Sequence, residues 1–456
     1  MFELDTIAAL ATPLSPAGIG IIRISGPEAV INTDKIFCGK VTLAEAKTHT
    51  IHYGKIMDGD EIVDEVLVSV MRGPHSYTGE DVTEINCHGG VLVMKKVLSL
   101  VYSLGIRPAE PGEFTKRAFL NGRLDLSQAA SVMEVIEADS EAALKNSMKH
   151  LKGSFSHEIK EIRDMILHET AYIEAALDDP EHYELGTYGD KLKEKLQPVI
   201  SRLQNLSLSY REGSLIHNGI RTAIVGRPNV GKSSLLNFLS RQERAIVSNI
   251  PGTTRDTLEE SVRLGDLTLH LIDTAGIRRT DDTIEKIGVD RALASIDEAD
   301  LILFLLDSSR SLSEDDIKLY HQVQDKQVVL LCNKSDLEFH RDIEEFCRSV
   351  NCPVVYFSTK TGEGKDELMD VITNLFFHGA LAGAEDFYVS SERDKLELES
   401  ASHSLELVCG SVDAGMTEDF FSIDLMDAYT SLGRILGEAV DEDLVNRIFA
   451  DFCMGK

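Results

Sequence analysis

The sequence has few of the features that stabilise secreted or membrane proteins. Its 456 residues include seven Cys, an odd number, with no C-x-x-C pair among them. That pattern argues against a disulfide framework or a zinc ribbon and favours a reducing compartment. No uninterrupted apolar run reaches the roughly 18 residues of a membrane span. The opening MFELDTIAALATP carries acids where an export signal carries Lys or Arg, so we expect no signal and a cytoplasmic protein.

Basic residues are also scarce. The chain has 46 Lys and Arg against 76 Asp and Glu, a formal net charge of −30. This balance argues against loose, non-specific binding to nucleic acids, which needs a cationic surface, although a local basic face remains compatible with it. At roughly 150 residues per domain, the length predicts about three domains.

Residues 1–118 mix short strands with turns and predict an α+β domain. Residues 18–24 and 63–70 alternate like strands, 82–87 predict a third strand, and 91–104 predict a helix. Residues 119–217 then change to a helical period. Leu151, Phe155, Ile159, Ile162 and Ile166 form one apolar helix face.

Residues 218–378 repeat a strand, a loop and a helix. The runs 221–225, 269–272, 301–306 and 328–332 resemble buried parallel strands, which predicts a doubly wound, mostly parallel α/β sheet. Helical patterning returns in residues 379–456. We therefore predict a Ras-like P-loop domain at 218–378, inserted into an all-α domain made of 119–217 and 379–456.

A phosphate-binding motif occupies Gly226–Ser233, with the sequence GRPNVGKS. It follows a predicted strand and opens a predicted helix, as a P-loop does. Backbone amides and the helix N-terminus would face phosphate oxygens. Lys232 would bridge the β- and γ-phosphates, and the Ser233 hydroxyl would bind Mg²⁺.

Three further segments follow in the order that a GTPase requires. Asp273–Gly276 closes a strand, where the Asp reaches Mg²⁺ through water and the Gly amide meets a γ-phosphate. Asn333–Asp336 closes another, and its Asp accepts two hydrogen bonds that guanine donates and adenine does not. Ser358–Lys360 is placed for a further base contact, and Thr254 for completing the Mg²⁺ shell. The sequence thus predicts a GTPase.

The water-orienting Gln found after D-x-x-G in many GTPases is replaced here by Ile277. An acid can hold the water instead. We favour Glu285, but the residues alone do not separate it from Asp281 and Asp282. A partner's arginine, Arg278 or a monovalent cation would neutralise the developing charge.

The whole sequence resembles the MnmE (TrmE) family of tRNA-modification GTPases. Besides the G motifs in its middle third, the family's marks are Asp5–Ala8, Gly20–Gly26, Ser76–Asp81, Arg107–Thr115, Arg117–Leu126 and the ending Phe452–Lys456. The resemblance implies a GTP hydrolase that acts with a flavin-dependent MnmG-type partner, an FAD protein, in a heterotetrameric complex. The implied reaction adds an aminomethyl or carboxymethylaminomethyl group at C5 of the wobble uridine of certain tRNAs.

The resemblance also implies a homodimer formed by the N-terminal domains and a tetrahydrofolate site there. The ligand would be 5-formyl- or methylene-tetrahydrofolate, held by Arg23, Glu84, Arg123 and Lys456. A carboxylate and several cations suit a polar pteridine with an acidic glutamate tail. Cys453 matches a terminal cysteine that the modification requires.

Potassium-dependent dimerisation of the G domains is a third implication, and Glu285 matches the acid that positions the water. The K⁺ positions are Asn229, Ser248, Ile250 and Thr253. The expected nucleotide-binding residues are Asn229, Val230, Gly231, Lys232, Ser233, Ser234, Ser248, Asn249, Ile250, Pro251, Gly252, Thr253, Thr254, Asp273, Thr274, Ala275, Gly276, Asn333, Lys334, Ser335, Asp336, Ser358, Thr359 and Lys360.

Two other functions share a similar G domain. A ribosome-assembly GTPase usually adds a G-x-x-G clamp or a basic tail, whereas the C-terminal segment here is helical and acidic. A regulatory GTPase with a metabolite-sensing N-terminal domain would bind folate without a tRNA phenotype.

Overall fold

The computed structural model describes residues 5–179, 188–242, 260–272, 296–377, 387–438, 442–450 and 452–456. The protein forms two compact units. The first comprises Met1–Ile136, Lys149–Ile200 and Ser400–Lys456, and the second comprises Glu137–Met148 and Ser201–Glu399. No helix in the described ranges is long and apolar enough to cross a membrane.

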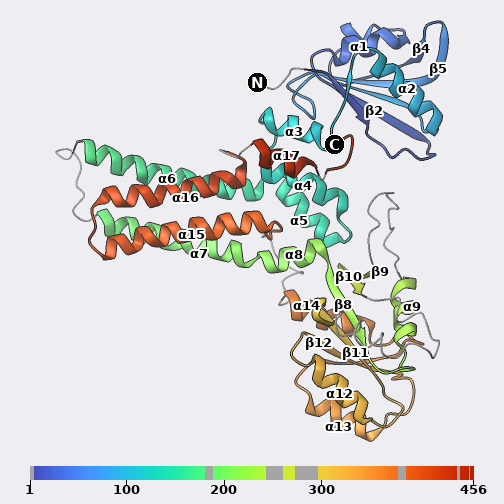
Figure 1. Cartoon of the computed structure of the whole chain (residues 1–456), viewed down its shortest axis with the longest axis vertical. Coiled ribbons are helices and arrows are strands. Elements are labelled where there is room, and N and C mark those ends of the chain that lie inside the picture. Colours follow the sequence, from blue (N-terminus) through green and yellow to red (C-terminus); the bar gives the residue numbers. More distant parts are fainter. Residues whose placement is uncertain are drawn as a thin grey trace. The chain divides into compact units, whose positions relative to one another are not determined.

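The first unit begins with a seven-stranded sheet in the order β3-β4-β5-β6-β2-β1-β7. Its strands are β1 (Ile7–Leu10), β2 (Ile19–Ser25), β3 (Phe37–Gly39), β4 (Thr50–Asp58), β5 (Glu61–Met71), β6 (Val82–His88) and β7 (Arg107–Pro108). Helices α1 (Ala29–Ile36) and α2 (Val91–Ser103) cover one face, as Figure 1 shows. Ile22, Ile24, Ile85 and Val97 are fully buried between these helices and the sheet.

The sheet face opposite α1 and α2 carries both polar and apolar side chains. Strand pairing places Ile51, Ser69, Glu84 and Arg23 in one row across β4, β5, β6 and β2. Neighbouring partners in a row lie on the same face of a sheet. Arg23 and Glu84 are therefore on the face opposite α1 and α2.

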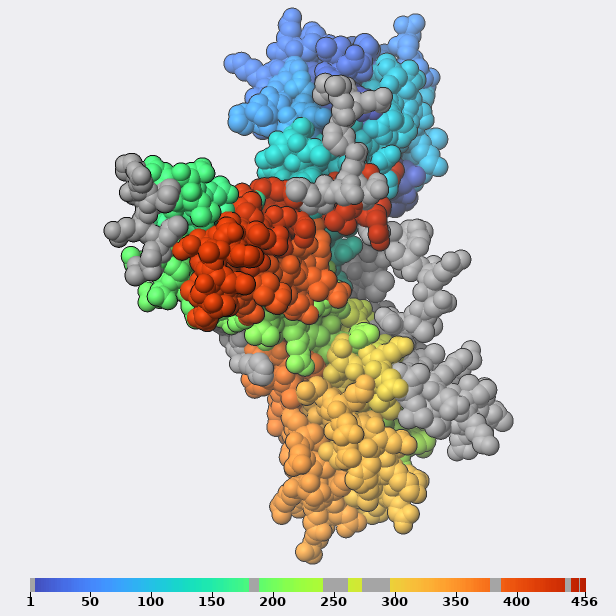
Figure 2. All heavy atoms as spheres, turned by 60° about the vertical axis from the view of Figure 1, so that its left-hand side comes forward, coloured from blue at the N-terminus to red at the C-terminus, as the bar shows by residue number. Residues whose placement is uncertain are grey.

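Long helices form the rest of the first unit (Figure 1). They are α3 (Glu113–Leu120), α4 (Leu126–Glu137), α5 (Glu141–Leu151), α6 (Ser154–Asp178), α7 (Tyr188–Leu208), α15 (Glu392–Asp413), α16 (Glu418–Leu436) and α17 (Glu442–Ala450), with α5, α7, α15 and the last residue of α4 shared between the units. Within the bundle, the Tyr188 hydroxyl donates to Glu169 at 2.7 Å and Lys193 pairs with Asp413 at 2.5 Å. Figure 2 shows part of the surface of α16 in red. Asp419 and Phe420 of this helix are exposed.

The second unit contains a six-stranded sheet in the order β13-β12-β11-β8-β10-β9, parallel except for β9. Its elements are α8 (Tyr210–Asn218), β8 (Ile220–Val225), α9 (Lys232–Gln242), β9 (Glu260–Leu264), β10 (Leu267–Ile272), β11 (Leu301–Asp307), α12 (Glu314–Val323), β12 (Val328–Asn333), α13 (Arg341–Ser349), β13 (Val354–Phe357) and α14 (Lys365–Phe377). Both faces are covered: Leu303 packs in one apolar cluster with Leu235 of α9, and Phe304 in another with Tyr320 of α12.

The predicted fold class is confirmed. The strands expected at 18–24, 63–70, 82–87, 221–225, 301–306 and 328–332 correspond to β2, β5, β6, β8, β11 and β12. The helix expected at 91–104 is α2. Four strands of the first sheet, β1, β3, β4 and β7, were not predicted from the sequence.

Candidate nucleotide and folate sites

The P-loop connects β8 to α9 at the carboxyl edge of the second sheet. Gly226, Asn229 and Gly231 have φ values of 155°, 66° and 110°. A Cβ on Gly231 would lie 2.2 Å from Nδ2 of Asn333, so only glycine fits this turn. The loop therefore approaches the base-recognition turn closely, and Nδ2 of Asn333 donates to the carbonyl of Val230 at 2.8 Å.

Lys232 is the first residue of α9 and lies inside the loop. Its ammonium donates to the carbonyl of Gly226 and, at 2.9 Å, to that of Arg227. Burial lowers the pKa of Lys232. A partly desolvated cation at the N-terminus of a helix suits the phosphates of a nucleotide, since two carbonyl dipoles alone satisfy its charge poorly.

The residues expected to recognise guanine meet at the ends of β12 and β13. Asn333 is buried, and its Oδ1 accepts from the amide of Thr359 at 3.3 Å. Oδ1 of Asp336 accepts from the Ser358 hydroxyl at 2.7 Å, and the Ser335 amide donates to Phe357. Hydrogen bonds thus join two segments that are separated in the sequence, and the Ser358 hydroxyl of the second segment supports the Asp336 carboxylate of the first.

The remaining expected G-domain residues lie outside the described residues. They are Ser248, Asn249, Ile250, Pro251, Gly252, Thr253, Thr254, Asp273, Thr274, Ala275, Gly276 and Glu285. Among the expected nucleotide-binding residues that are described, Asn229, Val230, Gly231, Lys232, Ser233 and Ser234 share the P-loop and the start of α9.

The expected folate residues converge in the first unit. Nε of Arg23 pairs with Oε1 of Glu84 at 2.8 Å across β2 and β6, and Nη1 of Arg23 donates to the carbonyl of Gly455 at 2.9 Å. Arg23 and Arg123 each lie over the Tyr77 ring, with guanidinium carbons 5.5 and 5.0 Å from its centroid. Tyr77 was not predicted as a site residue, although it lies in the recognised Ser76–Asp81 segment.

The C-terminal end of the protein is held against this cluster. Gly455 has φ 84°, and a Cβ there would lie 2.1 Å from the carbonyl oxygen of Leu10. Lys456 is half-buried, and burial followed by the charge of Arg23 lowers its pKa. The Cys453 carbonyl accepts from the amides of Gly112 and Lys456. Cys453 is itself partly buried and packs against the cluster of α4 and α17.

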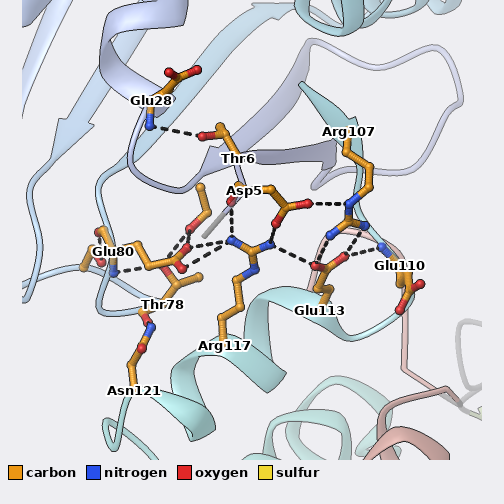
Figure 3. A network of polar contacts seen from close by, with 12 residues as sticks. Asp5, Thr6, Glu28, Thr78, Glu80, Arg107, Glu110, Glu113, Arg117 and Asn121 are labelled. Atoms are coloured by element: carbon orange, nitrogen blue, oxygen red, sulfur yellow. Dashed lines mark hydrogen bonds and ion pairs between the residues drawn. The ribbon is translucent and has the colours of Figure 1, made fainter. Parts of the chain in front are cut away.

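A charged network supports the loop that carries Tyr77 (Figure 3). Arg117 of α3 is within 2.7 Å of Asp5, 3.0 Å of Glu113 and 3.2 Å of Glu80. Glu80 also accepts from the Ser25 hydroxyl at 2.7 Å. Since Ser25 ends β2 and Glu80 follows Tyr77 closely, this network ties the loop to the strand that bears Arg23.

The second unit defines a class of protein. A parallel α/β sheet with a G-x-x-x-x-G-K-S loop opening a helix, and an N-K-x-D turn joined to it through Asn333, is a P-loop GTPase domain. Here that domain is accompanied by a separate sheet and a helical bundle.

Comparison with known proteins identifies the family. A family model described as "MnmE helical domain" matches residues 126–453, and one described as "GTP-binding protein TrmE N-terminus" matches residues 6–123. The protein named tRNA modification GTPase MnmE from Lachnoclostridium phytofermentans is 53% identical, with 100% of both proteins covered. The Bacillus subtilis protein of that name is 43% identical, over 99% of this chain and 100% of its own. The chain belongs to the MnmE (TrmE) family of tRNA modification GTPases.

A solved structure of Era from Aquifex aeolicus is also similar. It is 27% identical and covers 41% of this chain and 67% of its own, with a TM-score of 0.28. The assignment of the G domain rests on the sheet order and motifs rather than on this likeness.

Proposed function

We propose that this protein is a GTP hydrolase that, with a flavin-dependent MnmG-type partner, drives addition of an aminomethyl or carboxymethylaminomethyl group at C5 of the wobble uridine of certain tRNAs. The observation that supports it most is full-length identity of 53% to a relative named tRNA modification GTPase MnmE. The proposal includes a cytoplasmic location and three domains, at 1–118, at 119–217 with 379–456, and at 218–378.

Nucleoside analysis tests this proposal. In cells lacking the protein, C5-modified wobble uridines should fall, and expression of the wild-type protein should restore them. A Lys232→Ala variant should not restore them, whereas Lys96→Ala, on α2 far from any G motif in sequence, should. Unchanged wobble uridines with accumulated ribosomal precursors would instead support a ribosome-assembly GTPase.

In the proposed hydrolysis, Ser233 and Thr254 would hold Mg²⁺, and Asn229, Ser248, Ile250 and Thr253 would hold K⁺. The place of Ser233 in the first turn of α9 suits a Mg²⁺ ligand beside the nucleotide phosphates. Asn229 is exposed, as a K⁺ ligand at a contact with a second G domain would have to be. K⁺ would supply positive charge toward the leaving group, and Glu285 would hold the attacking water. GTP turnover should be faster in KCl than in NaCl at equal ionic strength, and Glu285→Ala should lower turnover while GTP affinity is kept.

The folate proposal is supported by the chemistry of the first unit. Arg23, Arg123 and Lys456 bring three cations around Tyr77 and Glu84, which fits an acidic ligand with an aromatic, hydrogen-bonding head. The folate would supply a one-carbon unit. Arg23→Ala should weaken binding of 5-formyl-tetrahydrofolate and leave GTP affinity unchanged. Equal folate affinity in wild type and Arg23→Ala would reject the site.

A homodimer through the first sheet is supported by exposed apolar side chains on the face opposite α1 and α2. Ile51, Tyr53 and Leu67 are 66%, 63% and 47% exposed beside Arg23 and Glu84, an unusual concentration of apolar side chains for a free surface. Ile51→Glu with Tyr53→Glu should yield a monomer in sedimentation equilibrium. A dimer of unchanged affinity would contradict this arrangement.

A further inference from the structure

A buried acid stands at the carboxyl end of β11, outside every motif described above. Asp307 is the last residue of that strand and pairs in register with Asn333 of β12. Its side chain is only 6% exposed. A carboxylate so placed is costly unless it is fully hydrogen-bonded, so its partners indicate what it does.

The partners of Asp307 include the guanine-recognition turn. Oδ2 accepts from the ammonium of Lys334 at 2.6 Å. Oδ1 accepts from the amide and hydroxyl of Ser309 at 3.1 and 2.6 Å. Burial raises the pKa of Asp307, but the hydrogen bonds from Lys334 and Ser309 outweigh it and lower the pKa, so the carboxylate is ionised at neutral pH.

The turn itself needs outside support. Lys334 has φ 67°, the left-handed region that non-glycine residues rarely adopt. The residue after Asp307 supplies a second tie, because the amide and hydroxyl of Ser308 both donate to the carbonyl of Asn333, at 3.0 and 2.6 Å. The Asn333 carbonyl and the Lys334 side chain are thus both held by residues at the end of β11.

We propose that Asp307 is a positioning residue for guanine recognition, which acts by holding the Lys334 side chain and the strained turn so that Asp336 faces the base. This rests on the proposed GTPase function and adds a specificity determinant to it. Because Lys334 and Asp336 are two residues apart, release of the ammonium from Asp307 removes a restraint on the segment that presents the Asp336 carboxylate. The phosphate-binding Lys232 lies on another loop and keeps its own contacts.

The test measures fluorescent GDP binding and GTP turnover by the full-length protein. Asp307→Asn keeps the side-chain shape and removes the charge. We expect GDP to bind about tenfold more weakly, as loss of one charge-assisted hydrogen bond predicts, with turnover at saturating GTP within about twofold of wild type. Asp307→Glu, which keeps the charge, should restore part of the affinity. Asp315→Asn is the matched control, since Asp315 is 72% exposed and lies 3.9 Å from Lys318; it should bind GDP like wild type.

A mutant cycle separates positioning from a purely structural role. If Asp307 acts through Lys334, then Asp307→Asn should cause no further loss in a Lys334→Met background. Additive losses, unchanged GDP affinity in Asp307→Asn, or a lower turnover with unchanged affinity would each overturn the inference. If Asp307→Asn does not fold, as judged by thermal unfolding, the same binding measurements on Asp307→Glu and on its double mutant with Lys334→Met test the inference instead. A wild-type protein that fails to bind GDP would reject the proposed function instead.

Discussion

Replacing Arg117 by Met should strongly destabilise the part of the first unit around Arg117. The guanidinium contacts three carboxylates, from Asp5, Glu80 and Glu113, while only 10% of its side chain is exposed (Figure 3). Removing one partner from a buried ion pair costs about 3–5 kcal/mol, because the charge that remains is still buried, as that of Glu113 is here. Arg107 still lies 2.7 Å from both Asp5 and Glu113, so the lower end, about 3 kcal/mol, applies.

Native-state hydrogen exchange is the assay, because a protein of several domains has no single free energy of unfolding. At about 1.4 kcal/mol per factor of ten, amides in α3 and in the Tyr77 loop should exchange roughly 100-fold faster in Arg117→Met. The control is Lys96→Met, whose exposed pair with Glu61 at 3.0 Å contributes less than about 1 kcal/mol. Equal exchange in the wild-type and Arg117→Met proteins would refute the reasoning.

The same network has a definite pH dependence. Hydrogen bonding to Arg107 lowers the pKa of Asp5. Burial raises the pKa of Glu113, but the hydrogen bonds from Arg107, the Glu110 amide and Arg117 together outweigh burial, so the pKa of Glu113 is lowered too. Because both pKa values are depressed, the two ionised carboxylates stabilise the fold at any pH above their ordinary pKa values, 3.8 for Asp5 and 4.5 for Glu113. This stabilisation is lost as the pH falls through the depressed pKa values. Protection of α3 should persist near pH 4 in the wild type and fail at a higher pH in Arg117→Met.

Three other predictions concern single sites. Lys232→Ala should lose GTP binding by at least about tenfold in equilibrium titration while the thermal unfolding of the protein is kept; unchanged affinity would argue against the P-loop. Gly455→Ala should detach the C-terminal end, because its Cβ would lie 2.1 Å from the Leu10 carbonyl, and so weaken folate binding with GTP affinity intact. Burial, and then the charge of Asp64, raises the pKa of Cys87 to about 11, so iodoacetamide should label it slowly until the pH approaches that value. The stability that the fold gains from this raised pKa is present below pH 9 and is lost as the pH rises toward 11. Rapid labelling of Cys87 at pH 9 would contradict the raised pKa.

Local patterns predicted the parts of the site that lie close together in the sequence. The P-loop and the N-K-S-D turn were recognisable because each packs its chemistry into a few residues with a fixed backbone shape. The register that sets Arg23 opposite Glu84 was not predictable, since it depends on pairing between strands that are 61 residues apart. β4 was missed because Gly54 and the polar residues around it obscure its alternation. Asp307 was overlooked because an Asp at the end of a strand is an ordinary turn residue until its contact with Lys334 is known.

The position of the C-terminal end could not be predicted from local sequence patterns either. Arg23 meets the carbonyl of Gly455 across 432 residues of sequence, and a terminal Gly-Lys pair ordinarily predicts a frayed end. The family resemblance, rather than any periodicity, suggested that Lys456 belongs with Arg23 and Arg123. The structure adds Tyr77, whose ring is contacted by both guanidinium groups.

The most direct test of the account is a comparison of GTP, ATP and XTP binding by the wild-type protein and by Asp336→Asn. In the proposed site the carboxylate of Asp336 would accept from two guanine N–H groups, whereas an amide also donates and so would match the carbonyl that xanthine has in place of the guanine amine. We predict that the wild type binds GTP at least about a hundredfold more tightly than ATP, and that Asp336→Asn prefers XTP. A wild-type protein that binds ATP as tightly as GTP would contradict the central claim that a guanine-nucleotide switch controls this protein.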